Sequence, residues 1–241
     1  MDEVKRMKRI GLVFLLISSV WGAPQPNIMK GQARDARGAA LAGVKIFARN
    51  TLHYNTNAIA VSDAAGKYSV NVSRPLGTWH ASAQIERKLN GQKYTFYLHP
   101  DNDDAFAGNV GAERNFVWKL QGEKPEGGFY GGYVVGYGAI DNPFYVEMDK
   151  VQLTLEPVGN LADGSPGKTI SKMLTRTPDG DALQDVPVGR YKLTARYTDP
   201  EHAGNLLIRV RDRGNYASEV VADFEVVTTT VHHIQFEVKS P

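Results

Sequence analysis

Short segments with a two-residue periodicity constrain this chain more than any other feature. Tyr68, Val70 and Val72 alternate with polar residues, and Tyr191, Leu193, Ala195 and Tyr197 do the same in the second half. Clusters of Gly, Asn and Asp separate these segments, and helical periodicity never lasts longer than a turn or two. Alternation of this kind places one set of side chains on each face of a strand. The sequence therefore predicts an all-β protein built as antiparallel β-sandwiches of transthyretin-like or immunoglobulin-like type.

The chain divides at a polar, turn-rich stretch that begins after Gln121. Gly122, Pro125, Gly127 and Gly128 are interspersed there with charged residues. We therefore predict a first sandwich over residues 27–121, a Gly-rich linker over 122–132 and a second sandwich over 133–241. A single extended sandwich would give many of the same signals.

The two halves also share a local pattern that indicates a repeat. Asp63 and Gly66 precede Tyr68 in the first half, and Asp179 and Gly180 precede Tyr191 in the second. On this pattern we expect two related domains in tandem, with Tyr68 and Tyr191 on corresponding strands.

The N-terminal residues have the layout of a secretory signal peptide. Basic residues precede an apolar run over Ile10–Val20, and the small residues Gly22 and Ala23 follow it. We predict a signal peptide over residues 1–23 and export to the periplasm or the cell exterior, with no membrane span after cleavage. An uncleaved N-terminal anchor is the alternative.

Composition excludes several classes of function. The chain has no cysteine, which removes disulfides, thiol catalysis and Cys-based zinc sites. The formal net charge is +2. Four basic and two acidic residues of the predicted signal account for all of it (4 − 2 = +2), so the mature chain is near neutral. A nucleic-acid partner is therefore not expected, because binding one requires a basic face.

One stretch of the first half resembles a known family. The stretch carries Lys30-Gly31-Gln32-Ala33-Arg34-Asp35, then Gly38, Leu41–Ile46 and Ser62–Tyr68, and it resembles the carboxypeptidase regulatory-like domain. In the second half, Val186–Leu193 looks like one piece of the same family. The resemblance implies a seven-stranded, transthyretin-like sandwich of an accessory, non-catalytic kind, grouped with carbohydrate-binding-like folds. Such a widespread fold does not by itself determine a function.

No catalytic motif stands out along the chain. The six histidines occur without a His-Glu-x-x-His pattern, and no Gly-x-Ser-x-Gly elbow is present. His232 and His233 are adjacent in an alternating segment, so their side chains should point to opposite faces, one buried and the other solvated. We therefore expect a protein that is not an enzyme. A hydrolase of unknown type, or a regulatory subunit of an enzyme, is a minor alternative.

Two groups of residues are candidates for binding. Asp101, Asp103 and Asp104 offer hard oxygen ligands that could hold Ca²⁺, although an ordinary acidic loop explains them as well. No other cofactor is expected. The second group is aromatic, and we predict that its exposed rings stack on a glycan: Tyr97, Tyr130, Tyr133 and Tyr137. The tyrosines near the junction could equally pack the two domains together.

The function predicted from the sequence is thus that of an exported, non-catalytic binding module for carbohydrate. The alternative is a structural or assembly protein of the cell envelope or surface that acts by protein–protein contacts. Such a protein could recruit its partner through an edge strand, for which the regular final segment after Thr228–Thr230 is the candidate.

Overall fold

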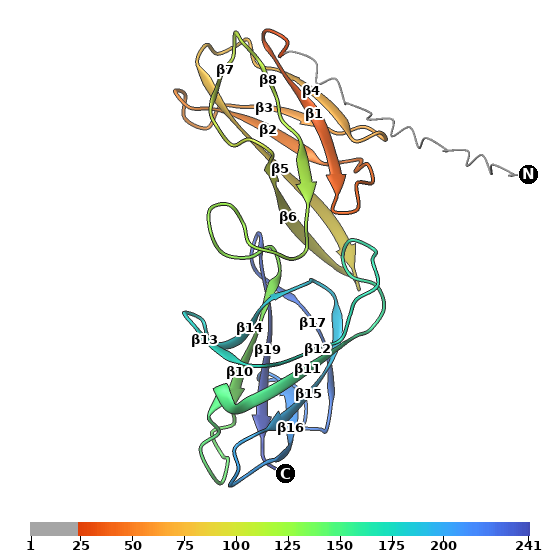
Figure 1. Ribbon diagram of the computed structural model, residues 1–241, viewed down its shortest axis with the longest axis vertical. Helices are drawn as coiled ribbons and strands as arrows, with labels where there is room; N and C mark the ends of the chain where they lie inside the picture. The colour runs from red at the N-terminus through yellow and green to blue at the C-terminus, as the bar shows by residue number, and fades with distance from the viewer. Residues whose placement is uncertain (1–23) are drawn as a thin grey trace, which may run out of the picture.

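A computed structural model describes residues 24–241 as two β domains placed end to end (Figure 1). The prediction of an all-β protein with two sandwiches is confirmed, since one short 3₁₀ helix, η1 (Met148–Lys150), is the only helix among the described residues. The first domain contains β1 (Ile28–Asp35), β2 (Lys45–Asn50), β3 (Asn57–Val61), β4 (Lys67–Asn71), β5 (Thr78–Leu89), β6 (Gln92–Pro100), β7 (Phe106–Ala107), β8 (Ala112–Glu113) and β9 (Phe116–Trp118). The second contains β10 (Gly132–Gly138), β11 (Val151–Pro157), β12 (Ile170–Met173), β13 (Thr175–Thr177), β14 (Gly180–Val186), β15 (Arg190–Tyr197), β16 (Gly204–Val210), β17 (Val220–Asp223), β18 (Glu225–Thr228) and β19 (Val231–Lys239).

The two domains have the same strand order. The first runs β3-β2-β5-β6-β9-β1-β4, and the second runs β12-β11-β15-β16-β19-β10-β14 with β13 added at the end. In each domain the first and last strands pair with each other in parallel, β1 with β9 and β10 with β19. Most other strand pairs are antiparallel. The second half is therefore a topological repeat of the first. No pairing between strands of different domains occurs among residues 24–241, so the domains are two separate sandwiches.

The repeat has a different register from the one expected. Tyr68 lies on β4, at the end of its sheet, whereas Tyr191 lies on β15, which is central and corresponds to β5. The expectation that Tyr68 and Tyr191 correspond is therefore wrong. The residue equivalent to Tyr191 is Trp79, and both follow a Pro-x-Gly-x sequence: Pro75-Leu76-Gly77-Thr78-Trp79 and Pro187-Val188-Gly189-Arg190-Tyr191. Both rings are almost completely buried because each opens the strand that crosses the middle of its domain.

The turn before β4 has the geometry that its residues predict. Asp63 Oδ1 accepts hydrogen bonds from the main-chain nitrogens of Ala65 (2.9 Å) and Lys67 (2.8 Å). Gly66 has a φ of +73°, and a Cβ there would lie 2.4 Å from the carbonyl oxygen of Ala33. A side chain at this position would thus be strained by its backbone and would also clash.

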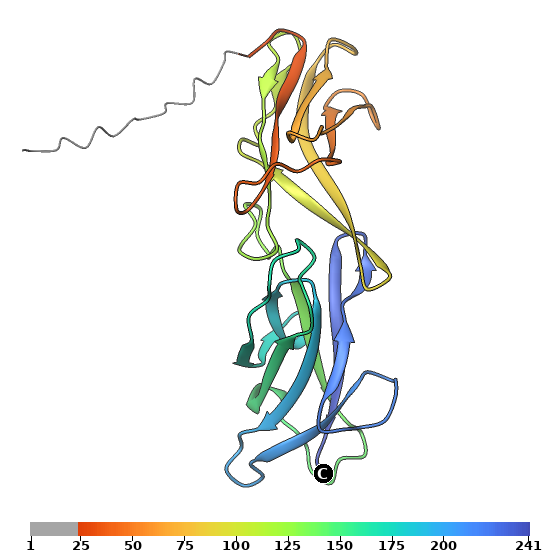
Figure 2. The same cartoon turned by 90° about the vertical axis from the view of Figure 1, so that its right-hand side faces the viewer.

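The segment predicted as a linker is itself folded. Main-chain hydrogen bonds join Lys124 N to Gly128 O (3.0 Å) and Tyr130 N to Gly122 O (2.9 Å), which closes a small loop between β9 and β10. On the side of the junction opposite this loop, the β5–β6 hairpin reaches the second domain (Figure 2). There the hydroxyl of Tyr94 donates to the carbonyl oxygen of Phe224 at 2.7 Å. The domains therefore meet through direct contacts as well as through the connecting chain.

Candidate functional site

The tyrosines near the junction lie apart, each against a different side chain. Tyr130 packs edge-on against His99 of the first domain, with ring centroids 5.4 Å apart. Tyr133 packs against His233, and the guanidinium of Arg211 lies 3.6 Å from the ring centre of Tyr137. All three tyrosines are half-buried. The structure does not bring them together as one flat platform, and Tyr130 contributes to the contact between the domains.

Tyr97 is exposed, as its position opposite Tyr94 and Phe96 on β6 predicts. Its exposed fraction is 48%, while Tyr94 and Phe96 are buried. Tyr97 borders a hollow of about 500 Å³ on the outer face of β2, β5 and β6, with Phe47, Arg49 and His99. Its ring is the one predicted glycan contact that lies on an open surface.

The aspartates of the acidic loop are separated by the loop's own hydrogen bonds. The two carboxylate oxygens of Asp101 accept from the main-chain nitrogen (3.0 Å) and the side-chain nitrogen (2.9 Å) of Asn115. The carbonyl oxygen of Asp104 accepts from Arg114 at 2.9 Å. The carboxylates of Asp101, Asp103 and Asp104 do not form a cluster with the spacing of metal ligands. Calcium binding by this loop stays a prediction.

Within residues 24–241, a single group does have the spacing of metal ligands: Asp199, Glu201 and His202. The carboxylate of Asp199 already accepts from Lys150 Nζ at 2.6 Å, and this bond lowers its pKa. The His202 ring stacks on Phe144 with centroids 4.1 Å apart. These contacts account for the group as part of the fold.

Both adjacent histidines of β19 are buried, which corrects the expectation that one is solvated. His232 lies between the domains, with its ring centroid 5.4 Å from that of Tyr94 and 5.2 Å from that of Phe96. Burial, with His233 and Lys124 nearby, lowers the pKa of His232 to about 4. On the opposite face His233 is covered by Tyr133, and burial lowers its pKa too. Both faces of β19 are covered at the two histidines, so both imidazole rings are buried.

The final strand is not an edge. β19 pairs with β10 on one side and with β16 and β18 on the other, so the expectation that it recruits a partner is wrong. The parallel pairing of β10 with β19 places the end of the chain inside the sheet, and alternation alone does not reveal such a pairing.

A free edge does occur at β3, which the sequence reasoning missed. Among the strands of residues 24–241, β3 pairs only with β2 and ends the order of its sheet. Ile59 and Val61 point outward from it with exposed fractions of 51% and 59%. The exposed apolar alternation Asn57-Ala58-Ile59-Ala60-Val61 is the signal that could have indicated it.

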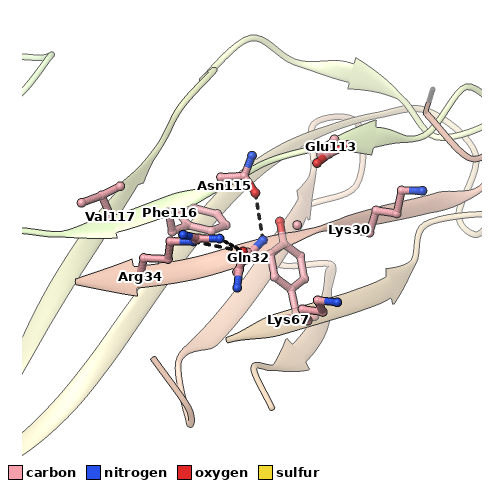
Figure 3. A pocket seen from close by; sticks show the side chains of 10 residues that line it. Lys30, Gln32, Arg34, Lys67, Glu113, Asn115, Phe116 and Val117 are labelled. Atoms are coloured by element: carbon pink, nitrogen blue, oxygen red, sulfur yellow. Dashed lines mark hydrogen bonds between the residues drawn. The ribbon is translucent and has the colours of Figure 1, made fainter. Parts of the chain in front are cut away.

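A second missed feature is a groove of about 650 Å³ over the outer face of β1 (Figure 3). On β1 the buried residues Met29 and Ala33 point into the core. The side chains of Lys30, Gln32 and Arg34 point outward from the same strand, into the groove. Lys67 of β4 borders one side, and the chain from Glu113 to Val117 borders the other. Gly31 lies at its base, where a Cβ would be only 1.8 Å from the carbonyl oxygen of Arg114.

Two predictions concern export and the membrane. The predicted signal peptide at residues 1–23 lies outside the described residues. Over residues 24–241, helices of the length and apolarity needed to cross a bilayer do not occur.

Comparisons with known proteins identify no family for this chain. No family model matches the chain, and no curated protein matches it, so the resemblance to the carboxypeptidase regulatory-like domain stays a prediction. Among solved structures, the Bacillus anthracis TIE protein is similar at a TM-score of 0.37 and 10% identity, over 89% of this chain and 33% of that one. A minor pilin of Streptococcus agalactiae is similar at a TM-score of 0.28 and 14% identity, over 89% of this chain and 96% of that one. A C-terminal fragment of the pilus adhesin SpaC from Lactobacillus rhamnosus GG is similar at a TM-score of 0.29 and 11% identity, over 90% of this chain and 98% of that one. Likenesses at this level support no conclusion about the function of this chain.

Proposed function

We propose that this chain is an exported, non-catalytic surface or assembly protein that acts through protein contacts, with the free edge of β3 as its docking strand. The observation that carries the proposal is the unpaired outer edge of β3. It combines main-chain groups that have no partner in the described part of the chain with exposed apolar side chains.

Neighbouring hydrogen bonds establish which groups of β3 are free. Asn50 N donates to Thr56 O, and Ser62 N donates to Val44 O, each at 2.9 Å. In an antiparallel pair the residues that bond to the partner strand alternate with those that do not. Thr56, Ala58, Ala60 and Ser62 therefore face β2, while the N–H and C=O groups of Asn57, Ile59 and Val61 point away from it.

This edge lacks the usual protection against strand pairing. Natural edges are commonly covered or carry charge, proline or a bulge. Residues 57–61 contain neither charge nor proline, and their register with β2 is regular. By contrast, the outward residues of β4 at the other edge are Lys67, Ser69 and Asn71, all polar. An added strand at β3 would satisfy its free main-chain groups and cover Ile59 and Val61.

A second copy of this chain fits the β3 edge. In an antiparallel pairing centred on Ile59, that residue would face its own counterpart, and Asn57 would face Val61. Phe47 of β2 lies beside Ile59, so the apolar row would continue across the junction. No like charges would face each other between the two strands, and such charges would oppose pairing.

The test is the oligomeric state of the mature protein, measured by size-exclusion chromatography with light scattering over a concentration series. We expect reversible association that Ile59→Pro abolishes, because the lost N–H points away from β2 and the fold should tolerate proline there. Ser69→Pro is the matched control. Val72 N bonds to Asn27 O, so the N–H of Ser69 also points outward, at the other edge. A wild-type protein that stays monomeric, or association unaffected by Ile59→Pro, would contradict the proposal.

Glycan binding through Tyr97, Tyr130, Tyr133 and Tyr137 is the other candidate function. Three of these rings contact His99, His233 or Arg211, which leaves less free ring face for stacking. Tyr97 alone is on an open surface, so the geometry favours protein contacts over these aromatics as the main function.

A further inference from the structure

We propose that the groove over β1 is a binding site for an acidic polysaccharide, held by Lys30, Arg34 and Lys67. This site is separate from the β3 edge and from the predicted tyrosines, and neither its residues nor its ligand depend on the assembly function.

The groove gathers cations that no acid neutralises. Lys30, Arg34 and Lys67 all border it, and none of them forms an ion pair within residues 24–241. Glu113 is the one acidic residue in the lining. The mature chain is near neutral as a whole, so this surplus of positive charge is a local feature.

Arg34 is held in place by an amide. Gln32 Oε1 accepts from Arg34 Nε at 3.0 Å and from Nη2 at 2.6 Å (Figure 3). Gln32 Nε2 donates to Ala65 O at 2.7 Å. A neutral partner orients the guanidinium but leaves its charge uncompensated. The remaining donors, with the ammonium groups of Lys30 and Lys67, are available for an anion.

The wall opposite Lys67 is also organised. Asn115 Oδ1 accepts from the main-chain nitrogen of Gln32 at 2.9 Å, and Asp101 in turn binds both nitrogens of Asn115. Asp101 therefore has a role in the structure that requires no calcium. These bonds hold the chain between β8 and β9 open where its ladder with β1 is interrupted.

The geometry favours a polysaccharide over an acidic peptide. β1 is paired on both sides, so an extended peptide would find no free main-chain groups, which supply much of the affinity in strand addition. Lys30 and Arg34 are four residues apart on one strand, a separation of roughly 13 Å between their backbone positions. This spacing suits carboxylate or sulfate groups that recur along a chain. The side-chain stems and the exposed Val117 offer apolar surface to sugar rings.

The test is calorimetric titration of the mature protein with four probes: polygalacturonate, dextran sulfate, neutral dextran and poly-glutamate. We expect binding to at least one anionic polysaccharide, weakened by salt, and none to neutral dextran. The first two probes distinguish carboxylate from sulfate. The variant Lys30→Gln/Arg34→Gln should weaken binding at least about tenfold, a loss of about 1.4 kcal/mol. The affinity of Arg34→Lys should lie between those of wild type and this variant, because lysine keeps the positive charge but lacks the planar guanidinium with its paired donors.

The control variant is Lys45→Gln/Arg49→Gln on β2. These residues have the same spacing and also point outward, and Lys45 lies over Phe47. We expect this variant to bind like wild type, and thermal melting should confirm that every variant is folded. Equal weakening by the control would show non-specific attraction and overturn the proposal. Preferential binding of poly-glutamate, or no binding to either anionic polysaccharide, would also overturn it. None of these results bears on association through β3.

Discussion

Asp185 of the second domain binds the main-chain nitrogen of Gly122 through both carboxylate oxygens, at 3.0 and 2.9 Å. The same carboxylate accepts from Gly131 N at 3.1 Å, so one side chain holds both ends of the loop that connects the domains. Gln121 Nε2 also donates to the carbonyl oxygen of Asp185 at 3.1 Å. A segment whose composition suggests a flexible linker is thereby tied to β14.

The first prediction concerns this loop. Asp185→Ala leaves the nitrogens of Gly122 and Gly131 without their acceptor, and we expect a loss of about 1–3 kcal/mol in the free energy of unfolding. Asp212→Ala is the matched control, since Asp212 has a similar φ (+55° against +58°). Denaturant unfolding measures both. A loss no larger for Asp185→Ala than for Asp212→Ala would attribute the effect to backbone strain instead of the hydrogen bonds.

The second prediction concerns pH and His232. Its pKa falls to about 4 in the folded state, so the folded protein binds fewer protons than the unfolded chain, whose histidine has its usual value. The stability from the neutral ring is complete above about pH 6.5 and falls as the pH drops toward 4, by up to about 3 kcal/mol. His233 shifts in the same direction and adds to the loss.

His232→Phe should reduce this dependence, because phenylalanine can pack against Tyr94 and Phe96 without taking up a proton. Melting temperatures over the same pH range measure the effect, with substitution of the exposed His53 by Gln as control. An unchanged pH slope in His232→Phe would show that other groups cause the loss.

The third prediction tests the close approach beneath the groove. Gly31→Ala places a Cβ against the carbonyl oxygen of Arg114, a backbone atom, and we expect it to destabilise the first domain by about 3 kcal/mol. Gly204→Ala on β16 is the control, since a Cβ there meets nothing within 4 Å. Calorimetry should show a lowered transition for the first variant alone. Equal stability of both variants would mean that β1 and β8 can move apart.

The fourth prediction follows from the repeat. Trp79 and Tyr191 occupy equivalent central positions, so truncation of either to alanine should cost about 3–5 kcal/mol in its own domain. Tryptophan and tyrosine signals or amide exchange, followed for each domain, would separate the two effects. Equal loss of protection in both domains from either variant would instead indicate that the sandwiches unfold as one unit.

Much of the fold was predictable because strands with one buried face alternate visibly. Tyr68, Val70 and Val72 show this pattern on β4 and the following residue, and Gly66 marks the turn before them. The repeat was recognised, but the correspondence between its strands was wrong, since the Asp–Gly turns are common features and the first-half counterpart of Pro187–Tyr191, the segment Pro75–Trp79, went unnoticed. The proposed binding features were harder to predict from the sequence. Lys30, Gln32 and Arg34 look like any solvated face of a strand until Asn115 and Lys67 are placed around them.

The sequence by itself determined the all-β class with two sandwiches and the identity of many buried faces, because these depend on local periodicity and turn chemistry. Only the tertiary structure decided which strands became edges and which became central. β19 reads as a regular strand but is enclosed by β10, β16 and β18, while the short β3 is left open. Pairing partners are chosen by packing between residues far apart in the chain, and alternation within one strand carries no information about its neighbours. The same reason explains why both His232 and His233 are buried, because the domain contact and Tyr133 cover opposite faces of one strand.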